Sequence, residues 1–80
     1  MFNAKYMKEK IFSIINQIRS SKDLSPLSKI DESMLLREDL EMTSFDLAEL
    51  TVRIEDEYGI DIFEDGLVNT VGEIYAKLQK

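Results

Sequence analysis

Hydrophobic residues near the N-terminus recur at steps of three and four positions, which is the spacing of one face of a helix. The stripe consists of Ala4, Met7, Ile11, Ile14, Ile15 and Ile18. It predicts a helix over about residues 3–20 with one buried face. Lysines and an arginine occupy its other positions or follow its end, where cations also interact favourably with the helix dipole.

The periodicity is lost between residues 21 and 42, which we interpret as a long loop. Serines, an aspartate and the single proline of the chain lie near its start and are typical of turns and caps. Connections of this length are uncommon in compact domains. We therefore expect apolar side chains to pin the loop to the core, namely Leu24, Leu27, Ile30, Met34, Leu35, Leu36 and Leu40.

A second helix is predicted over residues 44–58, with clear signals at both ends. Thr43 and Asp46 have the spacing of a capping box, in which each side chain binds the backbone N–H of the other residue. Gly59 follows the helix, where a left-handed residue commonly ends one. The face predicted to contact the core contains Leu47, Leu50, Thr51, Ile54 and Tyr58.

A second capping box, formed by Thr70 and Glu73, predicts a final helix. Its apolar face consists of Val71, Ile74, Tyr75 and Leu78. Before it, residues 60–63 are interpreted as an extended loop, and residues 64–69 have room for at most a turn or two of helix. We therefore predict an all-α fold, a small three-to-four-helix bundle with a long loop between helices 1 and 2, formed by one domain over residues 1–80.

The composition excludes several kinds of chemistry. A chain of 80 residues has room for about one hydrophobic core. It contains no cysteine and no histidine, which excludes disulfides, thiolate metal sites, cysteine nucleophiles and histidine-dependent triads, and we predict no metal site. No apolar run approaches the roughly 20 residues that span a bilayer, and the N-terminus does not resemble an export signal, so we expect a cytoplasmic protein.

The acidic charge is concentrated in the middle of the chain. The net charge of −6 opposes binding to nucleic acid or to an anionic membrane, so we expect neither partner and favour a basic protein surface. Residues 31–65 contain 13 acids against two cations, Arg37 and Arg53. Acidic residues on exposed helix faces ordinarily do no more than keep the surface solvated.

The outward face of the second helix indicates that its acids do more than keep the surface solvated. Phe45 and Val52, seven positions apart, are predicted to face solvent among the carboxylates of Asp46, Glu49 and Asp56. Apolar and acidic groups aligned in this way indicate a strip that docks a partner. Ser44 directly precedes the strip at a helix N-terminus, where free N–H groups favour a phosphate, although a serine there is often only part of a cap.

The run LEMTSFDLAEL at residues 40–50, followed by IEDEYGIDI at residues 54–62, resembles the acyl carrier protein family. The similarity covers essentially the whole chain, including the long loop. The family's central Asp-Ser-Leu, after a Leu-Gly-x lead-in, reads here Thr43-Ser44-Phe45 after Leu40-Glu41-Met42. Serine is retained at the attachment point.

The resemblance implies that the chain is a carrier and not an enzyme, with no catalytic residue of its own. Ser44 would receive 4'-phosphopantetheine from coenzyme A through a separate phosphopantetheinyl transferase. The thiol of this covalent arm would hold an acyl or aminoacyl group as a thioester. The carrier, expected to be a monomer, would present that group to loading ligases and synthases with basic docking patches. The resemblance places partner recognition on Phe45, Asp46, Glu49, Val52, Glu55 and Asp56, and a sheltering lining for the acyl chain on Leu47, Leu50, Ile54, Ile62 and Ile74.

Departures from the family pattern leave the pathway open, among them a stretch between Ile62 and Thr70 that is shorter than in typical fatty-acid carriers and in which Gly66 weakens a helix. Thr43 replaces an aspartate, Glu41 replaces a glycine, and Arg53 places a cation within the acidic helix. The cargo could belong to fatty acid, polyketide, aminoacyl or surface-polysaccharide chemistry. Two other functions compete with a carrier: an unmodified helical adaptor that binds a partner through the acidic strip around Phe45 and Val52, and an enzyme based on paired carboxylates, for which a chain this small offers little pocket.

Overall fold

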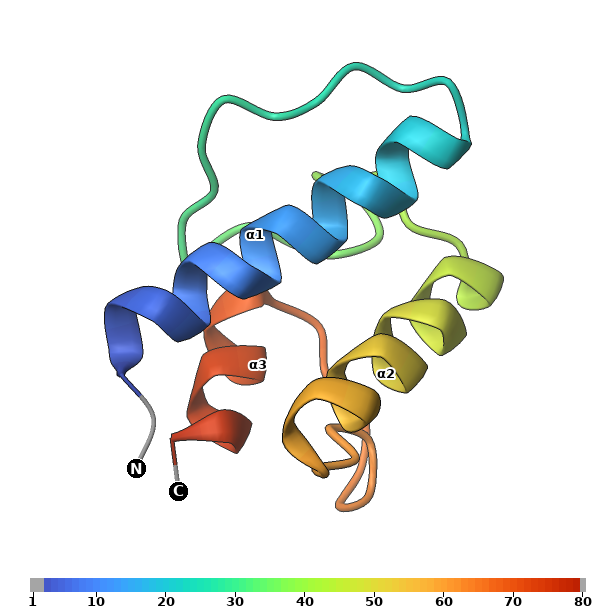
Figure 1. Cartoon of the computed structure of the whole chain (residues 1–80). Coiled ribbons are helices and arrows are strands. Elements are labelled where there is room, and N and C mark those ends of the chain that lie inside the picture. Colours follow the sequence, from blue (N-terminus) through green and yellow to red (C-terminus); the bar gives the residue numbers. More distant parts are fainter. Residues whose placement is uncertain (1–2, 80) are drawn as a thin grey trace.

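The computed structural model describes residues 3–79, and those residues form three helices and no strand (Figure 1). The helices are α1 (Ala4–Ser21), α2 (Ser44–Tyr58) and α3 (Val71–Leu78). The predicted all-α fold is confirmed, and α2 begins and ends where the capping signals indicate. Gly59 has a φ of 69°, the left-handed conformation expected of it at the end of α2.

The short helix considered for residues 64–69 does not form. Successive turns replace it, in which the Glu64 N–H donates to the Asp61 carbonyl and the Gly66 N–H donates to the Phe63 carbonyl. Gly66 has a φ of 133°, far from helical values, so the backbone leaves the turn there instead of continuing as a helix.

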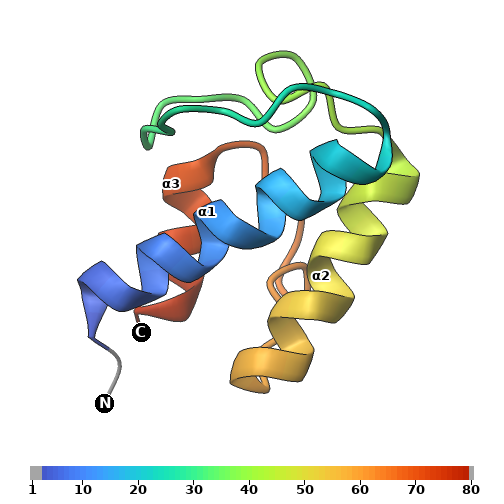
Figure 2. The same cartoon turned by 45° about the horizontal axis from the view of Figure 1, so that its top comes forward.

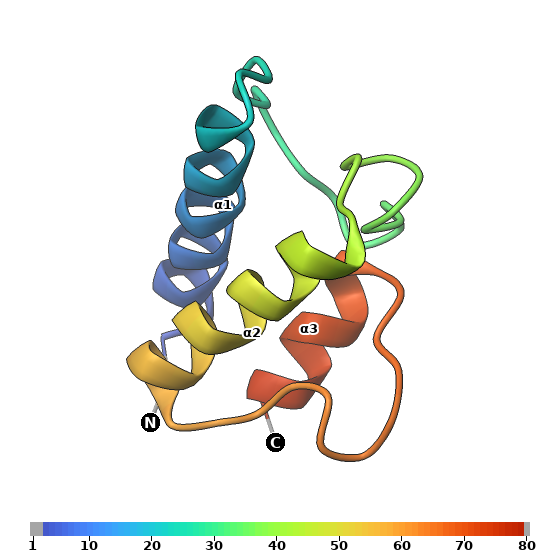
Figure 3. The ribbon, with the colours of Figure 1, turned by 90° about the vertical axis from the view of Figure 1, so that its right-hand side faces the viewer.

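The long loop crosses one end of the bundle (Figures 1 and 2). It leaves the C-terminal end of α1, passes beside the start of α3, where the Val71 N–H donates to the Met34 carbonyl, and then reaches the start of α2. The start of α1 and the ends of α2 and α3 lie at the opposite end of the molecule (Figure 3). The N-termini of α2 and α3 therefore share the end that the loop covers.

The core receives apolar side chains from all three helices. The stripe predicted for α1 is buried except for Ala4, which is exposed, and on the predicted face of α2 Thr51 and Tyr58 are only half-buried. Ile62 and Val68 add to the core from the connection between α2 and α3. The fully buried side chains include Met7, Ile11, Ile15, Leu50, Ile54, Val71 and Ile74.

The long loop is fastened to the core, as its apolar residues predict. Leu36 and Leu40 are buried, whereas Leu24, Leu27, Ile30, Met34 and Leu35 are half-buried. The buried guanidinium of Arg19 donates to the Ser25 carbonyl at 3.0 Å and to the Leu40 carbonyl at 3.1 Å, so one α1 side chain holds both halves of the loop. No helix among residues 3–79 is long and apolar enough to cross a membrane.

Candidate functional site

The start of α2 is held by the predicted capping box. The Asp46 N–H donates to the Thr43 hydroxyl at 3.2 Å, and the Thr43 N–H donates to the Asp46 carboxylate at 2.9 Å. Ser44 is the first residue of the helix and its side chain is exposed. The cap thus satisfies backbone groups through Thr43 and Asp46 and leaves the Ser44 hydroxyl available for chemistry.

Asp46 does not belong to the exposed strip in which the sequence placed it. Its side chain is buried, with the residue 5% exposed, and the Lys22 ammonium lies 2.6 Å from its carboxylate. Burial raises the pKa of Asp46, but the hydrogen bonds from Lys22 and Thr43 outweigh that effect and leave the pKa below its ordinary value of 3.8. The carboxylate is therefore a charged anchor between α2 and the end of α1.

A turn in the long loop places Arg37 beside Ser44. The Leu40 N–H donates to the Leu35 carbonyl at 3.1 Å, and the Leu35 N–H donates to the Asp39 carboxylate at 2.7 Å, so the chain reverses over these residues. The Arg37 guanidinium donates from Nη2 to Ser44 Oγ at 3.0 Å. The sequence offered Arg37 only as one of two cations in an acidic region, and this contact depends on the path of the loop.

The lead-in to Ser44 contains a residue in the left-handed region. Glu41 has a φ of 58°, a conformation that favours glycine, and this is the position where the family pattern has one. Lys22 donates to the Glu41 carbonyl at 2.8 Å, and the Glu41 carboxylate lies 3.7 Å from the Arg19 guanidinium. Contacts to α1 therefore accompany the backbone bend that leads into α2.

A cavity of about 280 Å³ opens next to Ser44, between α2 and the connection to α3. Leu67, 84% exposed, lies on its rim. Of the residues predicted to shelter an acyl chain, Leu47 contributes to this cavity, whereas Leu50, Ile54, Ile62 and Ile74 are fully buried in the core behind it. The lining residues are Arg37, Ser44, Leu47, Ala48, Thr51, Phe63, Leu67, Val68 and Asn69.

The remaining strip residues lie on the outer surface of α2. Phe45 is 80% exposed and Val52 is 64% exposed, and Glu55 and Asp56 are also exposed. Glu49 is half-buried, and its carboxylate accepts a hydrogen bond from Arg53 Nε at 2.9 Å. The exposed part of the strip is therefore apolar toward Ser44 and acidic toward the end of the helix.

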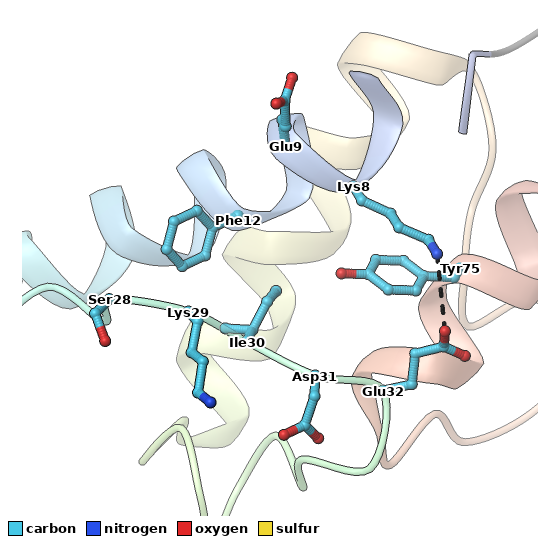
Figure 4. Close-up of a pocket in the computed structure, with 9 residues that line it drawn as sticks. All are labelled: Lys8, Glu9, Phe12, Ser28, Lys29, Ile30, Asp31, Glu32 and Tyr75. Atoms are coloured by element: carbon cyan, nitrogen blue, oxygen red, sulfur yellow. Dashed lines mark ion pairs between the residues drawn. The ribbon is translucent and has the colours of Figure 1, made fainter. Parts of the chain in front are cut away.

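A larger cavity, of about 500 Å³, lies elsewhere between α1, the long loop and α3 (Figure 4). Lys8 lies over the Tyr75 ring, 5.2 Å from its centroid, and its ammonium is 3.7 Å from the Glu32 carboxylate. Phe12 and Ile30 form its apolar wall (Figure 4). None of the residues predicted for attachment or docking lines it, so size alone does not identify the site.

The comparisons with known proteins agree with this geometry. The family model described as "Phosphopantetheine attachment site" matches residues 21–78. An acyl carrier protein of Saccharopolyspora erythraea is 38% identical over 69 residues, which cover 84% of this chain and 73% of the relative. An acyl carrier protein of Thermotoga maritima is 33% identical over 75 residues, covering 91% of this chain and 93% of the relative. The chain belongs to the acyl carrier protein family.

This acyl carrier protein has 4'-phosphopantetheine as its covalent prosthetic group. The start of α2 fits such a group, because an exposed hydroxyl, an arginine and a cavity meet at Ser44. Among residues 3–79 no three acidic side chains gather in a way that could hold a metal ion.

Proposed function

We propose that Ser44 is the residue that carries the phosphopantetheine arm, and that the chain acts as a carrier without catalysing a reaction itself. One observation carries the proposal: the Ser44 hydroxyl is exposed at the start of α2, beside the Arg37 guanidinium and on the edge of the cavity. In the modification, Ser44 Oγ forms a bond to phosphorus, the phosphoanhydride of coenzyme A breaks, and adenosine 3',5'-bisphosphate leaves. The transferase takes up the hydroxyl proton.

When bound, the arm supplies a thiol that holds an acyl or aminoacyl group as a thioester, which a chain without cysteine cannot supply itself. The role of the protein's own residues is to hold and shelter. The cavity beside Ser44 is lined partly by Leu47, Ala48 and Phe63, which suit the aliphatic part of a cargo. Fatty acid, polyketide and other specialised pathways are all compatible with this lining.

We propose that α2 docks the transferase, the loading ligases and the synthases through Phe45, Val52, Glu55 and Asp56. Phe45 provides apolar contact area next to Ser44 and Val52 adds to it further along α2, and the exposed carboxylates of Glu55 and Asp56 suit a basic patch on the partner. Asp46 and Glu49 are engaged within the chain by Lys22 and Arg53, so we assign them a smaller share of the docking energy. Such partners fit the cytoplasmic location expected from the sequence.

The attachment is tested by incubating the purified chain with coenzyme A and a broad-specificity phosphopantetheinyl transferase, followed by intact mass measurement. The wild type is expected to gain one phosphopantetheine and Ser44→Ala none. An unmodified wild type would support the competing adaptor, in which Ser44 is only part of a cap. A Ser44→Ala variant that gains the same mass would also overturn the proposal.

The docking surface is tested by the rate of that modification. Phe45→Ala is expected to lower the kcat/KM of the transferase for the carrier several-fold, because an exposed aromatic contact is lost. Tyr6→Ala is the matched control, since Tyr6 is an exposed aromatic residue on α1. If the kcat/KM of the transferase is the same for both variants and the wild type, Phe45 is not part of the docking surface.

A further inference from the structure

Arg37 is a cation without a carboxylate partner in the described part of the chain. The other cation in the acidic middle region, Arg53, pairs with Glu49 at 2.9 Å. Asp39, two residues from Arg37, uses its carboxylate to accept the Leu35 N–H. The contact that the structure gives to the Arg37 side chain is the hydrogen bond to Ser44 Oγ at 3.0 Å. Arg37 is therefore free to bind an anion that arises at that oxygen.

We propose that Arg37 binds the phosphodiester of the phosphopantetheine arm once Ser44 is modified. The inference rests on the proposed attachment at Ser44. Modification turns Ser44 Oγ into an ester oxygen, next to two non-bridging oxygens that share one negative charge. The guanidinium already reaches Oγ, and its planar array of N–H groups matches two phosphate oxygens at once.

The backbone around Arg37 is held firmly enough to direct this contact. Leu36 is fully buried, and its N–H donates to the Asn69 carbonyl at 2.9 Å, which ties this part of the loop to the residues before α3. Arg37 and Ser44 also line the same cavity. Arg37 is thus a positioning residue that holds the first bonds of the arm at the cavity mouth, where the cargo is sheltered.

The experiment compares loaded proteins by phosphorus NMR. Wild type, Arg37→Gln, Arg37→Lys and Arg53→Gln are treated with coenzyme A and transferase, and intact mass confirms that each is fully loaded. The phosphodiester resonance of each holo protein is then recorded at low salt and at about 1 M salt, where the Debye length is about 3 Å. The side-chain Nε–H resonance of Arg37 is followed in the wild type before and after loading, which requires no variant.

The phosphodiester resonance of Arg37→Gln is expected to differ from that of the wild type, whereas the resonance of Arg53→Gln should match the wild type. Arg53→Gln is the control because it also removes one cation from the acidic region. The phosphodiester resonance of Arg37→Lys is expected to lie between those of the wild type and Arg37→Gln, because lysine keeps the charge but lacks the planar array of N–H groups. High salt should move the wild-type resonance toward that of Arg37→Gln, and loading should shift the Arg37 Nε–H signal.

Two outcomes separate the two proposals. If loaded wild type and loaded Arg37→Gln have the same phosphorus resonance, and the Arg37 Nε–H signal does not move on loading, the role of Arg37 is overturned. The attachment at Ser44 is then left intact. A wild type that gains no mass would overturn the attachment at Ser44, and the role of Arg37 with it.

Discussion

The two capping boxes of the chain have the same local design and opposite surroundings. In both, a threonine hydroxyl accepts a hydrogen bond from the backbone N–H of an acidic residue three positions later. The N–H of Asp46 lies 3.2 Å from the Thr43 hydroxyl, and the N–H of Glu73 lies 3.2 Å from the Thr70 hydroxyl. The first helical residue is exposed Ser44 in α2 and fully buried Val71 in α3. The acid is buried in the first box and exposed in the second.

The difference shows that the cap starts a helix but does not define a site. Val71, the first residue of α3, packs into the core. Its N–H donates to the Met34 carbonyl of the long loop at 3.1 Å. At α2 the buried Asp46 holds the helix to Lys22, which leaves the first residue free to face Arg37 and the cavity. The surroundings, and not the cap, distinguish the proposed attachment site at Ser44 from the structural helix start at Val71.

The largest effect is expected from Val71→Ser, which gives α3 the residue that begins α2. It removes a fully buried apolar side chain and places a hydroxyl in the core, so the free energy of unfolding should fall by about 2–3 kcal/mol. Urea unfolding followed by circular dichroism measures the change. The new serine should also remain unmodified by the transferase, and a stable, modified Val71→Ser protein would contradict the comparison.

Removing either threonine should have a smaller and similar effect. Thr43→Ala and Thr70→Ala each lose a cap, which costs about 1 kcal/mol in the free energy of unfolding. The measurement is the urea midpoint of each variant at neutral pH. A negligible loss at one of them would show that the two boxes do not stabilise their helices in the same way.

The buried acid of the first box should make stability depend on pH. Because the pKa of Asp46 in the folded chain is lowered from 3.8, its stabilisation is present above that value and is lost as the pH falls through the lower folded pKa. Asp46→Asn should therefore lower the free energy of unfolding by about 1 kcal/mol at pH 7 and by progressively less below about pH 4.

Urea unfolding at a series of pH values tests this, with Glu73→Gln as the control from the second box. The hydrogen bond from Asn69, which outweighs desolvation, those from Thr70 and the nearby charge of Lys77 also lower the pKa of Glu73, but Glu73 is exposed, whereas Asp46 is buried and lies 2.6 Å from the Lys22 ammonium. An Asp46→Asn protein whose stability follows the wild type at every pH would remove Asp46 as an anchor.

The smallest change in stability is expected for Ser44→Ala. The side chain is exposed and the cap does not use its hydroxyl, so the free energy of unfolding should stay within about 0.5 kcal/mol of the wild type. Thermal melts of the unmodified proteins measure this. A large loss would mean that Ser44 is part of the fold and would weaken its assignment as a site.

Most of the helical framework follows from local signals. The threonines, their acidic partners and Gly59 mark the ends of α2 and the start of α3 within the chain itself, because caps act over three or four residues. The apolar stripe of α1 likewise predicts its buried face. At most a turn or two of helix is expected for residues 64–69, and they form turns instead, because Gly66 has a positive φ.

The site depends on contacts that no local pattern contains. Asp46 was predicted on the surface because helix geometry alone places it beside Phe45, whereas Lys22, 24 positions earlier, covers it. Arg37 reaches Ser44 only because the long loop turns back at residues 35–40. The sequence therefore predicted the serine and the exposed Phe45 and Val52, but not the cation beside the serine.

Of the seven serines in this chain, we propose that Ser44 alone carries the prosthetic arm. The direct measurement is fragmentation mass spectrometry of the wild type after loading with coenzyme A and transferase. We predict a single phosphopantetheine on the peptide that contains Ser44, localised to that side chain. A group found on another serine, or a chain that gains none, would contradict attachment at Ser44.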